Sequence, residues 1–136
     1  MTADLRDLST ARLREARLLL QSGEYSGAYY LAGYSVECAF KACITRKFKR
    51  YELPDKRVVS SAHTHDLEQL AELAGLIGAL RQEAGTNPKF EVNWNIVRDW
   101  NEAALYTLWL RSDAEDLIRA IGTRGHGVLP WIKRHW

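Results

Sequence analysis

The sequence predicts an all-α protein: an up-and-down bundle of four to six helices that forms a single domain over residues 1–136. Apolar residues recur at three- and four-residue intervals through most of the chain, whereas the alternation typical of strands is nearly absent. A length of 136 residues, with 46% hydrophobic and 26% charged residues, is typical of one globular domain. No internal repeat divides the chain further.

Two long helices are expected in the first half. The first covers the segment DLRDLSTARLREARLLLQSG and ends at Gly23, a residue type common just after a helix. The residues that recur with helical spacing in it are Leu5, Leu8, Arg12, Ala16, Leu19 and Leu20. The second is expected from about Glu24 to Phe48, roughly seven turns at 3.6 residues each. Because apolar and aromatic residues surround its axis, we expect it to be the central helix.

Shorter helices are expected beyond a loop around Pro54. Asp66 followed by Gln69 predicts a capped helix start, and Gly75 predicts the end of that helix. Another helix is expected at about 77–84, followed by a turn cluster in GTNPKF.

The last part of the chain predicts three further features. The segment VNWNIVRDWNEAALYTLWL predicts a short helix and then an irregular bend. Ser112 with Glu115 predicts a capping box for the helix that follows. Pro130 suits the first turn of a final helix.

Composition excludes several classes of protein. The net charge of +2 is not that of a strongly basic nucleic-acid-binding domain. Cys38 and Cys43 lie on different faces of one expected helix, so they do not pair, and a reducing cytoplasm is expected. No apolar run approaches the roughly 20 residues that cross a bilayer.

Glu37 and Lys41 are the two charged residues in the apolar stretch AYYLAGYSVECAFKACI. Their spacing places them on one face of the second helix, where a pair with the acid first stabilises the helix by a few tenths of a kcal/mol. Unpaired burial would cost several kcal/mol, so this face must reach solvent or a polar partner. Two interpretations remain open: a stabilising pair, or a polar stripe where Lys41 meets a phosphate near a dimer axis.

Four segments together resemble the HEPN domain family, in the prokaryotic branch associated with small nucleotidyltransferases. The stretch AYYLAGYSVECAFKACI is similar to the second helix of these domains, and HTHDLEQLAELAGL to the segment that often follows. NWNIVRDWNEAALY and GVLPWIKRHW resemble the third-helix region and the tryptophan-rich end. The resemblance covers most of the chain from about Ser22 to Trp136.

The resemblance implies a helical bundle that forms a homodimer and works on RNA or nucleotides. Many members are metal-independent ribonucleases, toxins or defence components, and a nucleotidyltransferase is a frequent partner. In the nucleases an arginine is followed, after four to six residues, by a histidine near the start of the last long helix. The histidine moves a proton, and the arginine holds the phosphate.

This chain departs from that nuclease motif. From Arg98 the histidine would stand at 103, 104 or 105, where the sequence has alanine, alanine and leucine. Tyr106 matches a tyrosine often found there. The departure argues against the usual nuclease site.

Two other pairs satisfy the spacing. Arg57 precedes His63 by six positions, and Arg119 precedes His126 by seven. With 13 arginines and four histidines in the chain, about one match is expected by chance. Arg119 with His126 is kept as the alternative, a displaced ribonuclease pair.

The segment RKFKRYELPDKR is the densest basic stretch. Its basic residues are Arg46, Lys47, Lys49, Arg50, Lys56 and Arg57. It is either a solvated helix end or a patch that contacts phosphate without sequence choice.

Three other clusters have plain structural explanations. The tyrosines 25, 29, 30 and 34 are expected to line the core or an interface. The segment HTHD, residues 63–66, offers metal ligands, but Asp66 is explained as a helix cap and no metal is expected. Five tryptophans are expected to pack between the last helices.

The sequence therefore predicts a cytoplasmic, non-catalytic module that binds a nucleotide, nucleic acid or partner protein, without cofactor, metal or membrane contact. The expected partners are a second copy and a nucleotidyltransferase, in a toxin–antitoxin or defence system. The predicted binding residues are Glu37, Lys41, Arg46, Lys47, Lys49, Arg50, Arg98 and Tyr106. The alternative is a metal-independent ribonuclease that uses Arg119 and His126.

Overall fold

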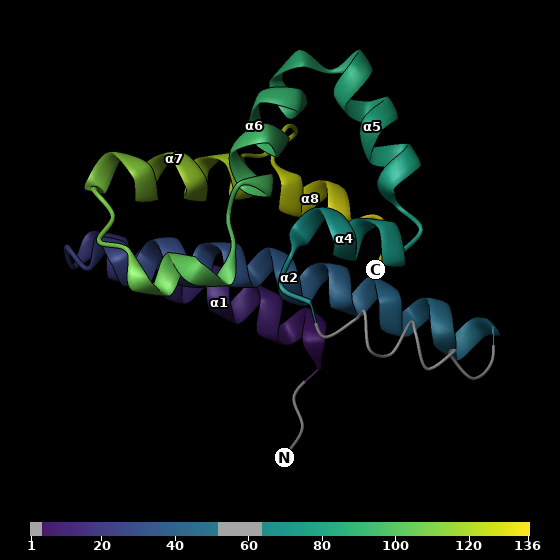
Figure 1. Cartoon of the computed structure of the whole chain (residues 1–136), viewed down its shortest axis with the longest axis horizontal. Coiled ribbons are helices and arrows are strands. Elements are labelled where there is room, and N and C mark those ends of the chain that lie inside the picture. Colours follow the sequence, from purple (N-terminus) through teal and green to yellow (C-terminus); the bar gives the residue numbers. More distant parts are fainter. Residues whose placement is uncertain (1–3, 52–63) are drawn as a thin grey trace.

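All regular elements in the described part of the chain are helices, which confirms the all-α class (Figure 1). The structure is a computed structural model that describes residues 4–51 and 64–136, with the backbone alone at residues 49–51. The elements are α1 (Leu5–Gln21), α2 (Tyr25–Tyr51), α4 (Leu67–Leu73), α5 (Ile77–Thr86), α6 (Pro88–Arg98), the 3-10 helix η1 (Glu102–Tyr106), α7 (Arg111–Gly122) and α8 (Val128–Lys133). None of these helices is long and apolar enough to cross a membrane.

The longest element, α2, is the central helix, as its all-round apolar sequence predicts. It contacts α1, α4, η1, α7 and α8. The helices α1 and α2 form an antiparallel pair joined by a tight turn at Gly23, whose φ of 81° suits glycine. Within this pair the buried Ser9 hydroxyl donates to the Ser35 carbonyl at 2.7 Å.

The second half of the chain covers α2. Figure 1 shows α7 and α8 lying along one side of α2, with α5 and α6 standing above them. The core between these layers is rich in large side chains that are almost fully buried, including Phe40, Phe90 and Trp100. The C-terminus ends beside α2 and α4.

Several predicted boundaries are confirmed by the contacts that form them. The side chain of Asp66 accepts a hydrogen bond from the backbone N–H of Gln69 at 3.0 Å, so it caps α4. Gly75 follows α4 with a φ of 74°. Pro130 lies in the first turn of α8.

The start of α7 differs from the prediction. Ser112 and Glu115 do not form its capping box, because both lie inside a helix that begins at Arg111. The Asp113 carboxylate instead accepts a hydrogen bond from the Leu110 backbone N–H at 3.0 Å. An acidic residue one position after the serine thus takes the role predicted for Glu115.

The expected turn at GTNPKF is also narrower than predicted. Gly85 and Thr86 continue α5, and Pro88 already begins α6. Asn87 alone separates the two helices, and its side chain accepts from the Phe90 N–H at 3.2 Å. Such short breaks bring the described residues to seven α-helices, one more than the expected upper number.

Trp100 packs tightly against the α2 backbone. Its indole ring lies so close to Gly33 that a Cβ atom on Gly33 would overlap the ring. Trp100 is only 2% exposed, and its Nε1 has no hydrogen-bond partner among the residues that the structure describes. A glycine is therefore required at this point of α2 to let the residues after α6 reach the central helix.

We expect Gly33→Ala to destabilise the protein by about 1–3 kcal/mol, the usual cost of overpacking a well-packed core. Urea denaturation followed by circular dichroism measures this. Gly78→Ala in α5 is the control, because a Cβ atom there meets nothing within 4 Å and alanine favours a helix. Equal stability changes in the two variants would contradict the packing argument.

Candidate functional site

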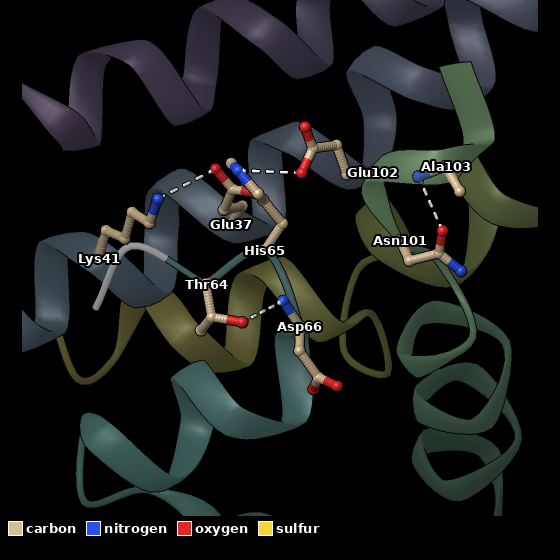
Figure 2. Close-up of polar contacts among 8 residues, drawn as sticks. All are labelled: Glu37, Lys41, Thr64, His65, Asp66, Asn101, Glu102 and Ala103. Carbon is tan, nitrogen blue, oxygen red and sulfur yellow. Dashed lines mark hydrogen bonds and ion pairs between the residues drawn. The ribbon is translucent and has the colours of Figure 1, made fainter. Parts of the chain in front are cut away.

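Glu37 is a carboxylate buried within the central helix, at 2% side-chain exposure. One carboxylate oxygen lies 3.2 Å from the Lys41 ammonium nitrogen, and the other lies 2.7 Å from Nδ1 of His65. The second ring nitrogen of His65, Nε2, lies 3.1 Å from a carboxylate oxygen of Glu102. Figure 2 shows these four side chains as one continuous polar network.

Three separate parts of the fold build this network. Glu37 and Lys41 share a face of α2 as an i, i+4 pair. His65 stands just before α4, in a segment where the Asp66 N–H donates to the Thr64 hydroxyl at 3.1 Å. Glu102 is the first residue of η1 (Figure 2).

The exposed fraction of the side chain differs widely among the four residues of the network. The side chains are 2% exposed at Glu37, 24% at Lys41, 39% at His65 and 60% at Glu102. Burying a carboxylate costs several kcal/mol unless charged hydrogen-bond donors accompany it. Lys41 and His65 supply hydrogen-bond donors to the Glu37 carboxylate, and the network extends from the core to the surface.

The pair predicted from sequence is therefore only half of the arrangement. Glu37 and Lys41 do contact each other, and their face of α2 is buried at the acid and partly exposed at the lysine. The second partner, His65, is 28 residues away in sequence. In the HTHD segment, the predicted role of Asp66 as a helix cap is confirmed. The sequence did not predict the contact of His65 with a carboxylate.

Two tyrosines of α2 adjoin the network. The rings of Tyr30 and Tyr34 stack with centroids 6.2 Å apart. Burial raises the pKa of the Tyr30 phenol, and the nearby charges of Glu37 and Glu102 raise it further. Both phenols therefore stay neutral around the site near pH 7.

The other tyrosines divide between core and surface. Tyr29 is buried and stacks on Trp109 with centroids 3.8 Å apart. Tyr106, a predicted binding residue, is 88% exposed at the end of η1.

Besides Lys41, two predicted basic residues, Arg46 and Lys47, have contacts at the end of α2. Arg46 donates to the main-chain carbonyls of His135 and Trp136 at 3.3 and 3.0 Å, and so fastens the end of α8 to α2. The Lys47 ammonium lies 3.5 Å from the Leu73 carbonyl at the end of α4. These contacts give both residues a structural role as well as a surface charge.

The remaining predicted binding residues lie elsewhere on the surface, or their side chains fall outside the described residues. Arg98 is exposed in the last turn of α6. The side chains of Lys49 and Arg50, together with Lys56, Arg57 and His63, lie outside the described residues.

Arg119 and His126 have separate partners. The Arg119 guanidinium pairs with Asp116 at 3.2 Å on the surface of α7. Nδ1 of His126 lies 3.3 Å from the Asn87 side-chain nitrogen, and its carbonyl accepts from Asn93 at 2.8 Å. Through these contacts, His126 links the turn before α8 to α6 and the residue before it.

The two cysteines are buried and unpaired with each other. Burial raises the pKa of each thiol from 9.0 to about 11. Neither offers a thiolate nucleophile at neutral pH. Among the residues that the structure describes, no group of three histidine, cysteine or acidic side chains is placed to hold a metal ion.

Comparison with known proteins adds no relative: no family model, no curated protein and no solved structure matches this chain. The function therefore has to be inferred from the geometry described above.

We expect Glu37→Gln to lower the free energy of unfolding by about 1–3 kcal/mol, because Lys41 and His65 would lose their buried carboxylate partner. Urea denaturation at neutral pH measures the change. Glu68→Gln is the control, since Glu68 makes only a surface contact of 3.6 Å with Arg81 and should change stability by less than about 0.5 kcal/mol. A loss no larger than that of the control would show that the network does not stabilise the fold.

Proposed function

We propose that the chain is a HEPN-like, non-catalytic module that binds the phosphates of RNA or of a nucleotide. It acts in the cytoplasm as a homodimer beside a nucleotidyltransferase partner, in a toxin–antitoxin or defence system. The observation that carries the proposal is the basic end of α2, which extends beyond the helix that pairs with it.

The lengths of the paired helices explain this extension. The helix α1 has 17 residues and α2 has 27, and the contact of Ser9 with Ser35 fixes their antiparallel register. The last turns of α2 therefore pass beyond the start of α1 (Figure 1).

The projecting end is strongly basic. Four of the five residues 46–50 are lysine or arginine, and no acidic residue occurs from 38 to 51. Arg46 and Lys47 are exposed there. Part of this charge compensates the negative end of the helix dipole. Four cations on one helix end also supply the sequence-independent attraction that phosphates require.

The surroundings of Arg119 and His126 favour binding over cleavage. A ribonuclease pair needs both side chains directed at one phosphodiester, with the imidazole free to move a proton. Arg119 instead pairs with Asp116, and His126 contacts Asn87. These contacts support the binding proposal over the displaced ribonuclease pair.

We expect single-stranded RNA to bind with an affinity that falls linearly in log salt, and Lys49→Gln with Arg50→Gln to reduce the slope by about 1.4, the value for two lost phosphate contacts on a single strand. Fluorescence anisotropy across a salt series measures the slope. A matched control, Lys89→Gln with Arg124→Gln, removes the same charge from exposed positions elsewhere.

Equal slopes in the two double variants would mean that only net charge matters. RNA cleavage in EDTA that His126→Ala abolishes would replace the binding proposal with the ribonuclease alternative.

The surface from residue 105 to residue 110 supports the homodimer. Leu105, Tyr106, Leu108 and Leu110 are 57%, 88%, 93% and 70% exposed. Four large, mainly apolar side chains exposed within six residues are uncommon on a monomer and often mark an interaction surface. The centre of a stable interface is mostly apolar, so this surface suits the contact between two copies.

We expect Leu108→Asp to shift the protein from dimer to monomer, because a charge buried at the centre of an apolar interface is strongly unfavourable. Light scattering coupled to size-exclusion chromatography measures the mass. Val92→Asp is the control, since Val92 is 59% exposed on α6, outside this surface. A wild-type protein that is monomeric at high concentration would contradict the proposal.

A further inference from the structure

The charges around Glu37 do not balance locally. The buried carboxylate contacts two groups that can carry a positive charge, the Lys41 ammonium and the His65 imidazole. Both ring nitrogens of His65 face carboxylate oxygens, at 2.7 Å on Nδ1 and 3.1 Å on Nε2. A neutral imidazole has only one N–H, whereas the charged form donates from both nitrogens. The doubly protonated ring is therefore the form that can donate to Glu37 and Glu102 at the same time.

With the ring in this form, the Glu37 carboxylate faces two positive charges, which leaves an excess of one positive charge. Glu102 meets this excess at Nε2, the ring nitrogen on the far side from Glu37 (Figure 2). With a side chain 60% exposed, Glu102 is the most accessible member of the network. Its carboxylate presents to Nε2 the same kind of anionic oxygen as a phosphate group does.

We propose that Nε2 of His65 is a binding point for a phosphate oxyanion and that Glu102 is its internal competitor. The proposal rests on the proposed function for its ligand class. Glu37 orients the imidazole through Nδ1, and Lys41 shares the negative charge of Glu37. When a phosphate binds, the Glu102 side chain leaves Nε2 and turns to solvent.

The backbone around Glu102 allows this exchange. The Asn101 side chain accepts from the Ala103 N–H at 2.8 Å, and the Trp109 indole donates to the Ala104 carbonyl at 3.0 Å. These bonds hold η1 without using the Glu102 carboxylate. Its side chain can therefore move while the helix stays in place.

Other groups near the His65 ring do not interfere with the exchange of Glu102 for a phosphate. Tyr30 beside Glu37 and Glu102 is neutral, because burial and both carboxylates raise the pKa of its phenol. The carboxylate of Asp66 is committed to the Gln69 N–H as the cap of α4. The Thr64 hydroxyl accepts from the Asp66 N–H.

The experiment compares Glu102→Gln with Glu91→Gln, which removes the same charge from an exposed position on α6. Binding of single-stranded RNA is measured by anisotropy, and binding of inorganic phosphate by the 15N shift of the His65 ring. We expect Glu102→Gln to tighten both by about two- to fivefold, the strength of an exposed ion pair, beyond the change in Glu91→Gln. In the RNA assay, adding His65→Gln should abolish that gain.

Equal changes in the two glutamate variants, or a gain that survives His65→Gln, would overturn the inference. The phosphate titration separates it from the proposed function. A response of His65 to phosphate without RNA binding supports this site and rejects the RNA ligand. RNA binding without any His65 response to phosphate, in the wild type and in Glu102→Gln, rejects this site alone.

Discussion

The burial of one carboxylate, Glu37, determines how three distant parts of the chain meet. A charged group at 2% exposure in the central helix requires charged donors, and α2 provides only Lys41. The second donor, His65, arrives from the segment before α4, and Glu102 joins it from η1. The position of α4 and η1 on α2 is thus linked to the electrostatic needs of a single side chain as well as to apolar packing.

The two halves of the central helix differ in their surroundings. In its first half, glycine at position 33 allows the Trp100 ring to reach the backbone. Its second half extends past α1 and is basic. The polar network stands near the transition between the halves, at Glu37 and Lys41. A phosphate held at His65 would therefore lie beside the helix that carries the basic end, because His65 contacts Glu37 of α2.

Several side chains of types that are common in active sites have structural roles here. Arg46 binds the last carbonyls of the chain, and His126 ties the turn before α8 to the start of α6. The raised pKa values of Cys38 and Cys43 keep both thiols protonated at neutral pH. Residue type alone is a weak guide to function here, because each of these groups satisfies a backbone or core requirement.

The sequence by itself determined the features that depend on neighbouring residues. Helical periodicity predicted the all-α class and the central helix. The cap at Asp66 and the glycine ends of α1 and α4 were also predicted, because each depends on contacts or backbone angles within a few residues. The start of α7 was placed wrongly, since Asp113 and Glu115 are equally plausible as the acid of a capping box in a local pattern.

Only the tertiary structure decided which polar groups meet. The spacing of Glu37 and Lys41 predicted one contact of the network, but His65 and Glu102 lie 28 and 65 residues from Glu37. The tertiary structure also assigned Arg119 and His126 to separate neighbours, although their spacing matched a nuclease pair. The physical reason is that helix periodicity sets the face on which a side chain lies, whereas its partner depends on how the whole chain packs.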